Sequence, residues 1–405
     1  MQLHRFWWIP LFFALSVNLK AQKITYQPIY EAALSNPNAL FELPALNNDS
    51  LMQAEQSQRR PGRPNYFAQA ITTNLSPENA GSWNKLKNGD LVWSLSIRSP
   101  NARSLNLGFD QFLLPPSANL YLYSGDFNTR IGPLTAHDNE EHLAWWSPMI
   151  AGKVLHLQLR IKSAELPQLR LRLRRINHDF ANFATTNTDN CFLDTGCGTE
   201  DGWTIVEKYK DQIRSVVLIT IEGIRACTAF LINNTANDCR PYFLSAFHCD
   251  VTPSDAPSVV VYWNYQNSYC RQPGTVASGN PGNGSLNNFN TGATYRAGYQ
   301  PSDFVLLELD DPIPSSSQAY FAGWSREATP PQDTVVCVHH PDGAEKRISF
   351  AFNDTYPGIW GNGNQEVPNG NHLIVPDWSV GSTEVGSSGA PLFNKQGRIV
   401  GQLHG

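Results

Sequence analysis

The sequence predicts an all-β protein made of two consecutive β-rich regions, and three observations lead to this prediction. Apolar and polar residues alternate with a period of two through much of residues 65–176, as at Leu155, Leu157 and Leu159. Short apolar runs separated by loops rich in Gly, Asn and Ser fill the remainder, with little helical periodicity. The 28 Pro and 29 Gly follow no repeat period, which is typical of many short strands joined by turns.

The composition excludes several classes of protein. The 405 residues include 30 Lys and Arg against 35 Asp and Glu, a formal net charge of −5. With 41% hydrophobic and 16% charged residues, the chain is neither disordered nor a coiled coil. A pI near 6.1 provides no overall field that attracts nucleic acid, so we expect no nucleic-acid partner.

The N-terminus has the pattern of a secretory signal peptide. His4 and Arg5 precede an apolar run over residues 6–17, which is too short to cross a bilayer but has the length of a signal-peptide core. We interpret residues 1–22 as a signal peptide rather than a buried N-terminal helix. No later stretch could span a membrane, so we expect a secreted, extracellular protein.

The order of the elements follows from the local patterns. Residues 23–64 are polar and read as an irregular linker, whereas residues 65–180 carry the period-two alternation of half-buried antiparallel strands and predict a β-sandwich. Residues 177–190 contain few apolar anchors and mark a boundary. The short runs within residues 191–405 predict the strands of β-barrels.

All seven cysteines lie after residue 190. In an exported protein they indicate disulfides rather than metal ligands or redox thiols, and the odd number leaves one without a partner. The cysteines are Cys191, Cys197, Cys227, Cys239, Cys249, Cys270 and Cys337.

Three separated features together predict nucleophilic catalysis. His248 follows an apolar strand and adjoins a cysteine, Asp303 opens a second apolar run, and Ser388 lies in the turn sequence GSSGAP. A serine hydroxyl needs a neighbouring base, and an aspartate can fix the tautomer of that base. Because Gly386 permits a sharp bend, its N–H and that of Ser388 can converge as an oxyanion hole.

Each feature alone has a less specific interpretation. A single histidine is usually structural, an aspartate at a strand start often forms a turn, and a Gly/Ser loop can match by chance. Asp250, Asp310 and Asp311 are alternatives to Asp303, but Asp250 is too close to His248 in sequence and the other two close a strand. His339 and His340 lack a third ligand at useful spacing, so we expect no metal and no cofactor.

From Cys191 to Gly405 the sequence resembles the bacterial lysyl endopeptidase branch of the chymotrypsin-like serine proteases. The matching stretches are ACTAFLINNTAND, AFHC, VVVYWNYQNSYCR, SDFVLLEL, HHPDGAEKRIS, GSSGAP and VGQLHG. The resemblance implies a double six-stranded β-barrel and a secreted serine endopeptidase that acts through an acyl-enzyme on protein or peptide substrates. It also implies that the enzyme prefers to cleave the peptide bond on the carboxyl side of Lys.

The resemblance also assigns roles to residues. The positions that match the family's triad are His248, Asp303 and Ser388, with Gly386 as an oxyanion donor. Trp360 and His404 match residues that flank the primary substrate pocket. The β-rich region before residue 180 is similar to the pro-regions of such enzymes, so the chain is expected to be a precursor, a zymogen, whose own pro-region is its partner.

The resemblance to this family also implies disulfides between Cys227 and Cys249 and between Cys197 and Cys270. The residue matching Cys191 has its partner beyond residue 405 in related enzymes. Cys239 and Cys337 have no counterpart, which leaves them either paired with each other or free.

The sequence departs from the family pattern at three places. Related enzymes continue past Gly405 and carry there the acidic residue behind their lysine preference, so we expect a fragment with an incomplete second barrel. Ser382 stands where trypsin-type pockets carry a carboxylate, which leaves apolar or broad specificity, or an inactive protease-fold binding protein, as alternatives. Ser387 replaces the aspartate of pancreatic-type zymogens, so we expect residues 23–190 to impose latency by covering the cleft.

Overall fold

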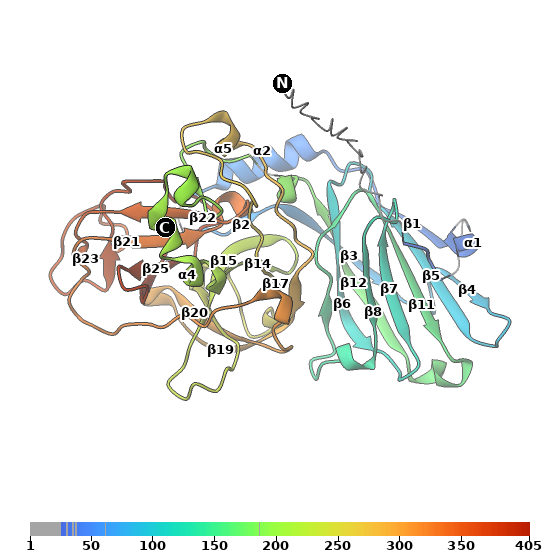
Figure 1. The fold of residues 1–405 in the computed structure, drawn as a ribbon. Helices are drawn as coiled ribbons and strands as arrows, with labels where there is room; N and C mark the ends of the chain where they lie inside the picture. The colour runs from blue at the N-terminus through green and yellow to red at the C-terminus, as the bar shows by residue number, and fades with distance from the viewer. Residues whose placement is uncertain (1–25, 30, 35, 37–38, 61, 186) are drawn as a thin grey trace, which may run out of the picture.

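The computed structural model describes residues 26–405 except residues 30, 35, 37–38, 61 and 186. The predicted signal peptide, residues 1–22, lies outside the described residues. Two β-rich lobes stand side by side, and the N-terminal one is on the right in Figure 1. The prediction of an all-β chain is confirmed. Among the described helices, none has the length and apolar character needed to cross a membrane.

The N-terminal lobe is a sandwich of two sheets. The first contains six strands in the order β1-β5-β11-β7-β8 with β4 paired to β5, and the second contains five in the order β10-β6-β12-β3 with β9 paired to β6. The strands of the first sheet are β1 (Leu40–Glu42), β4 (Ser82–Lys85), β5 (Leu91–Arg98), β7 (Asn119–Ser124), β8 (Arg130–Leu134) and β11 (Val154–Ile161). Those of the second are β3 (Ala68–Leu75), β6 (Ser104–Leu113), β9 (Trp145–Trp146), β10 (Ile150–Ala151) and β12 (Arg170–Asp179).

The period-two pattern determines how these strands pack. Leu155, Leu157 and Leu159 on β11 are completely buried and meet the inward side chains of the second sheet. On β12, Leu171 is buried whereas Arg172 points outward and pairs with the carboxylate of Asp110. Successive side chains of a strand alternate between faces, so the alternating sequence places one face in the core.

The prediction that residues 23–64 are irregular is wrong in part. This stretch holds α1 (Glu31–Leu34), β1 and the eleven-residue α2 (Asn48–Gln58). The side chain of Asn47 caps α2 by accepting from the N–H of Ser50. Only Leu51, Met52 and Ala54 of its eleven residues are apolar, too few for an apolar stripe that the periodicity could reveal.

The C-terminal lobe contains an eight-stranded sheet, a five-stranded sheet and a two-stranded sheet. The eight-stranded sheet consists of β18-β17-β14-β15-β16-β20-β19 with β2 paired to β15: β2 (Asn65–Tyr66), β14 (Val216–Ile221), β15 (Arg225–Ile232), β16 (Tyr242–Ala246), β17 (Val260–Tyr262), β18 (Phe289–Thr291), β19 (Ala293–Tyr299) and β20 (Phe304–Leu309). The five-stranded sheet has the order β13-β22-β21-β25-β26: β13 (Leu193–Asp194), β21 (Val335–His339), β22 (Arg347–Ala351), β25 (Pro391–Asn394) and β26 (Ile399–Gln402). β23 (Tyr356–Gly358) pairs with β24 (His372–Ile374), and the helices are α3 (Thr204–Glu207), α4 (Lys210–Ser215) and α5 (Val276–Gly279).

These sheets differ from the expected pair of six-stranded barrels in one instructive way. β2 was expected to begin the sandwich, but it pairs with β15 of the other lobe, Tyr66 opposite Arg225. The next residue, Phe67, is buried in the C-terminal lobe beside Phe183 and Tyr262. The N-terminal region therefore contributes a strand and an apolar anchor to the C-terminal lobe.

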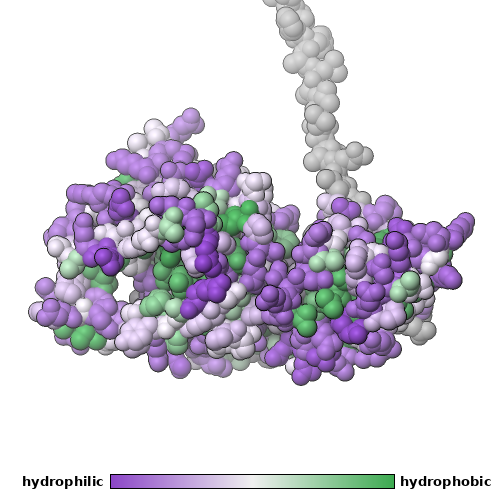
Figure 2. All heavy atoms as spheres, turned by 90° about the horizontal axis from the view of Figure 1, so that it is seen from below, coloured by the Kyte–Doolittle hydropathy of each residue, from purple (hydrophilic) through white to green (hydrophobic). Residues whose placement is uncertain are grey.

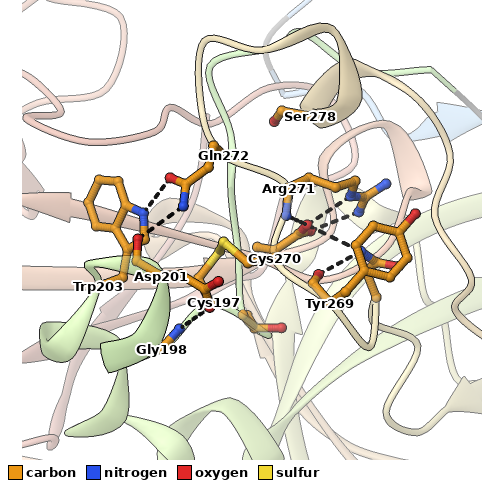
Figure 3. Close-up of a disulfide and its surroundings, with 12 residues drawn as sticks. Cys197, Gly198, Asp201, Trp203, Tyr269, Cys270, Arg271, Gln272 and Ser278 are labelled. Carbon is orange, nitrogen blue, oxygen red and sulfur yellow. Dashed lines mark hydrogen bonds and ion pairs between the residues drawn. A yellow bond between two sulfur atoms is a disulfide. The ribbon is translucent and has the colours of Figure 1, made fainter.

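Two of the expected disulfides are present, Cys197–Cys270 and Cys227–Cys249. Figure 3 shows the first of them, which joins the start of the C-terminal lobe to the segment before Arg271. A Cys239–Cys337 pair is not formed, and both thiols are free. Cys337 is buried in strand β21 whereas Cys239 lies on an exposed turn, so the alternative that leaves them free is the correct one.

Candidate active site

His248 lies in a short turn that directly follows β16. A 3-10 turn over Phe247–Cys249 ends at Asp250, which has a left-handed backbone with φ of 58°. The Cys227–Cys249 disulfide ties this turn to β15. The residue before His248, Phe247, follows β16 directly, and the residue after it, Cys249, is bonded to β15. His248 is therefore held at the end of the eight-stranded sheet.

Asp303 directly precedes β20, which pairs with β16 so that Phe304 faces Ala246. One carboxylate oxygen of Asp303 accepts the backbone N–H of His248 at 2.9 Å, and the other lies 2.8 Å from its Nδ1. Asp303 is 2% exposed. Two contacts to one carboxylate fix both the position and the tautomer of the imidazole. Its Nε2 is buried and has no hydrogen-bond partner among the described residues.

Ser388 sits in a tight turn between two glycines with positive φ. Gly386 has φ of +92°, and a Cβ there would lie 2.8 Å from the backbone nitrogen of Gly343. Gly389 has φ of +84° and would meet the carbonyl of Thr228. L-residues rarely adopt such angles, so both glycines are required by the turn. Ser388 is 7% exposed, and its carbonyl accepts the N–H of Thr228 at 2.9 Å.

The peptide before Gly386 has a defined orientation. The N–H of Asp342 donates to the carbonyl of Val385 at 2.6 Å. Because the C=O and N–H of a trans peptide point in opposite directions, the N–H of Gly386 points away from Asp342. Within the described chain, neither this N–H nor that of Ser388 donates a hydrogen bond to another residue. These are the two backbone donors from which the sequence predicted an oxyanion hole.

A buried histidine supports this turn from behind. His339 on β21 lies 2.8 Å from the Oγ of Ser387 through Nδ1 and 3.1 Å from that of Ser349 through Nε2. Burial, helped by Arg347, lowers the pKa of His339 to about 3, so the ring is neutral. These contacts agree with the structural role expected of His339.

Glu384 is a second residue that supports the turn of Ser388, and the sequence patterns did not point to it. Its backbone N–H donates to the Oγ of Ser387 at 3.3 Å. Burial raises the pKa of Glu384 to about 7, and the carboxylates of Asp342 and Asp189 add to the rise. No local pattern marks Glu384, because its neighbours come from distant parts of the chain.

A cavity of about 1030 Å³ opens beside these residues. The rings of Trp360 and His404 stack at 3.8 Å between centroids and line one wall. Thr383, rather than the expected Ser382, is among the described residues that line it. The other lining side chains are a mixture. Apolar ones include Cys337, Leu373, Val375, Trp378, Leu392 and Leu403, and polar ones include Glu327, Gln332 and Lys395. Figure 2 shows apolar side chains gathered in hollows of an otherwise largely hydrophilic surface.

His404 links the cavity to the other residues. Its ring stacks 5.5 Å from that of His248, and its Nε2 lies 3.7 Å from the Oδ2 of Asp303. His248, Asp303 and His404 each have one possible metal-ligand atom within 4.8 Å of those of the other two. A divalent ion could contact all three only by displacing the hydrogen bond between His248 and Asp303, so the arrangement is better suited to proton transfer.

The other acidic candidates lie elsewhere. Asp310 pairs with His142 of the N-terminal lobe and accepts from Thr294. Asp250 lies at the end of the turn, 3.9 Å from the guanidinium of Arg225. The structure therefore brings Asp303, and not these two, onto His248.

Comparisons with known proteins give the family. The family described as "Lysyl endopeptidase, C-terminal domain" matches residues 185–405, and the one described as "Lysyl endopeptidase N-terminal domain" matches residues 42–180. The lysyl endopeptidase of Pseudomonas aeruginosa is 26% identical over 273 residues, which cover 64% of this chain and 56% of that protein. The chain thus spans about half the length of this curated relative.

Among solved structures, the inactive form of Rv3671c from M. tuberculosis H37Rv is similar with a TM-score of 0.29 and 17% identity, over 48% of this chain and 76% of that one. This likeness is too weak to carry an argument. The match to the C-terminal domain, by contrast, covers more than half of the sequence. The chain belongs to the lysyl endopeptidase family.

Proposed function

We propose that the C-terminal lobe is a serine endopeptidase domain in which Ser388, His248 and Asp303 form the catalytic triad. The observation that carries the proposal is the pair of contacts from Asp303 to His248, which leave the Nε2 of His248 buried and without a partner. A base held in this way can accept a proton. The turn of Ser388 packs against the end of β16, where a Cβ on Gly389 would lie 2.7 Å from the backbone nitrogen of Ala246, although the Ser388 hydroxyl makes no hydrogen bond to Nε2 in the structure.

The chemistry follows from these positions. The Oγ of Ser388 bonds to the scissile carbonyl carbon while its proton passes to the Nε2 of His248. The negative oxygen formed in this step is bound by the N–H groups of Gly386 and Ser388. His248 then protonates the departing amine as the C–N bond breaks. Water repeats the sequence on the acyl-enzyme and restores Ser388.

The test of this proposal is the variant Ser388→Ala. We expect peptide hydrolysis to fall by about 10⁴-fold to 10⁶-fold, because the nucleophile is lost whereas substrate contacts remain. Ser254→Ala, an exposed serine outside the site, is the matched control. A fluorophosphonate probe should label the parent chain on Ser388. Unlabelled but folded parent protein would support the rival hypothesis of an inactive binding protein.

We propose Lys as the preferred residue on the cleaved carboxyl side, with family membership as its support. The apolar side chains in the cavity wall, which include Trp378 and Leu392, are the observation behind apolar specificity as a second candidate. Peptides that differ only in Lys, Arg or Phe at the cleaved bond distinguish the two. A higher kcat/KM for the Phe peptide would contradict the lysine preference.

We further propose that the protein is a secreted precursor with a signal peptide at 1–22, a pro-region that includes the sandwich at 65–180, and a protease domain at 191–405. The contact between the lobes supports a latent precursor. Arg59, just after α2, pairs with Asp342 at 2.9 Å, and the position of a Cβ on Gly62 lies 3.8 Å from Trp360. The segment between α2 and β2 thus borders both the turn of Gly386 and the cavity wall.

The variant Arg59→Glu tests this latency. Repulsion from Asp342 should loosen the segment and raise the hydrolysis rate of the unprocessed chain severalfold, while Arg60→Glu, an exposed neighbour, should not. Mass spectrometry verifies that the chain stays uncut during the assay. Equal rates for both variants would contradict a role for this segment.

A further inference from the structure

A chain of hydrogen bonds runs from the backbone before Asp303 to His404. The Nδ2 of Asn371 donates to the carbonyl of Pro301 at 2.9 Å. A carbonyl oxygen can only accept, so this contact fixes which end of the Asn371 amide is the nitrogen. The Oδ1 of Asn371 therefore faces the Nδ1 of His372, 2.8 Å away, and accepts its N–H.

This contact determines the tautomers of two histidines. With its proton on Nδ1, neutral His372 can only accept at Nε2. The atom that lies 2.9 Å from this Nε2 is the Nδ1 of His404, so His404 must donate from Nδ1. Burial lowers the pKa of His372, which favours its neutral form. Neutral His404 is consequently unprotonated at Nε2.

The unprotonated Nε2 of His404 faces the carboxylate of Asp303. Their separation of 3.7 Å exceeds the 2.7–3.2 Å of an N–H···O hydrogen bond, as expected when a lone pair faces an anion. The ring stacks on those of Trp360 and His248, at 3.8 Å and 5.5 Å between centroids, which restrains its tilt. Asp303 is thereby left to interact with His248 through both of its oxygens.

We propose that His372 is a positioning residue that holds His404 in its Nδ1–H form, so that the charge of Asp303 remains available to His248. This inference rests on the proposed protease function. The titratable groups that face His404 are Asp303, His248 and His372. If the pair of His372 and His404 gains one proton, His404 presents an N–H to Asp303. The carboxylate then stabilises the imidazolium of His248 less, and the base weakens.

The tautomer can be measured without any activity. In the full chain with Ser388→Ala, nitrogen-15 NMR of the imidazoles near pH 7.5 should show His404 protonated on Nδ1 and not on Nε2. Adding His372→Leu removes the acceptor and should shift His404 toward the Nε2–H form, which can donate to Asp303. An Nε2–H form of His404 with His372 intact would overturn the inference.

The kinetic test uses substitutions of the same residue. His372→Leu should lower kcat by about fivefold to tenfold with little change in KM, the factor that one net hydrogen bond provides. His372→Gln keeps an acceptor oxygen and should recover most of the loss. His137→Leu, an exposed histidine of the N-terminal lobe, is the control. Equal kcat for the Leu and Gln variants would overturn the inference.

Two further measurements separate the possible failures. If His372→Leu does not fold, Asn371→Ala removes the contact that orients His372 and should produce the same NMR shift in weaker form; an unchanged His404 signal there would overturn the inference. If the unsubstituted chain hydrolyses no peptide while His404 shows the expected tautomer, the proposed function fails and the positioning of His404 stands.

Discussion

The two lobes are both built from β-sheets, yet their sequences encode them differently. On β11 of the sandwich, buried leucines alternate with the polar residues His156, Gln158 and Arg160, of which Arg160 is exposed and Gln158 is buried with a hydrogen bond to Ser94. All six residues of β14 in the C-terminal lobe are buried, with Val217 and Ile219 in one apolar cluster and Leu218 in another. A strand that is buried on both faces is a continuous run of mostly apolar residues, so its sequence shows no alternation of apolar and polar residues.

The lobes differ equally in their charges. In the sandwich, Arg172 and Asp110 pair at the surface. In the C-terminal lobe, the buried carboxylate of Asp194 binds the guanidinium groups of Arg271 at 2.7 Å and Arg347 at 2.8 Å. Figure 3 shows Arg271 next to the disulfide of Cys270. The comparison teaches that the sandwich depends on its apolar face, whereas the C-terminal lobe also depends on ion pairs between distant segments.

The largest expected difference between the lobes concerns these ion pairs. Arg271→Met leaves Asp194 and Glu345 short of a cationic partner in the interior, which should lower the free energy of unfolding by about 3–5 kcal/mol. Arg172→Met removes an exposed pair and should cause no measurable change. Urea denaturation of both variants checks this. Equal losses would remove the distinction between the lobes.

A core truncation tests the other half of the comparison. Leu157→Ala removes a completely buried side chain between the two sheets and should cost about 3 kcal/mol of the free energy of unfolding. Leu113→Ala, at a position that is 37% exposed, is the control and should cost much less. Denaturant unfolding followed by tryptophan fluorescence measures both. Similar costs would show that the alternating face does not hold the sandwich together.

The smallest expected effect is a dependence on pH that only the C-terminal lobe should show. Burial lowers the pKa of Lys346 to about 7, and its Nζ donates to the carbonyl of Ile213. Above pH 7 the folded state has released this proton while the unfolded state keeps it, so stability rises with pH. Relative to Lys346→Met, the free energy of unfolding should increase by about 1.2 kcal/mol between pH 7.5 and 8.5.

Denaturant titrations of the parent and Lys346→Met at the two pH values give this difference. A parent curve that runs parallel to the variant would mean that Lys346 stays charged in the folded protein. The sandwich provides the internal reference, because its arginine pairs do not titrate in this range.

The sequence patterns predicted much of the fold and part of the candidate site. Alternation located the sandwich, and strand-end residues pointed to His248 and Asp303, which the structure brings together. The patterns missed α2, because a polar helix has no apolar stripe, and the crossing of β2 into the other lobe, because two residues define no partner. His372 went unnoticed, since its importance depends on a contact with His404.

The sequence by itself determined which faces of the sandwich strands are buried, because side chains alternate strictly along a strand and the apolar ones must leave water. It also pointed to Gly386 as the residue that lets the Ser388 turn bend sharply. Only the tertiary structure decided that β2 pairs with the other lobe, that Cys239 and Cys337 stay apart, and that His372 contacts His404. Those outcomes depend on distances of a few ångströms between distant segments, and no local pattern encodes such distances.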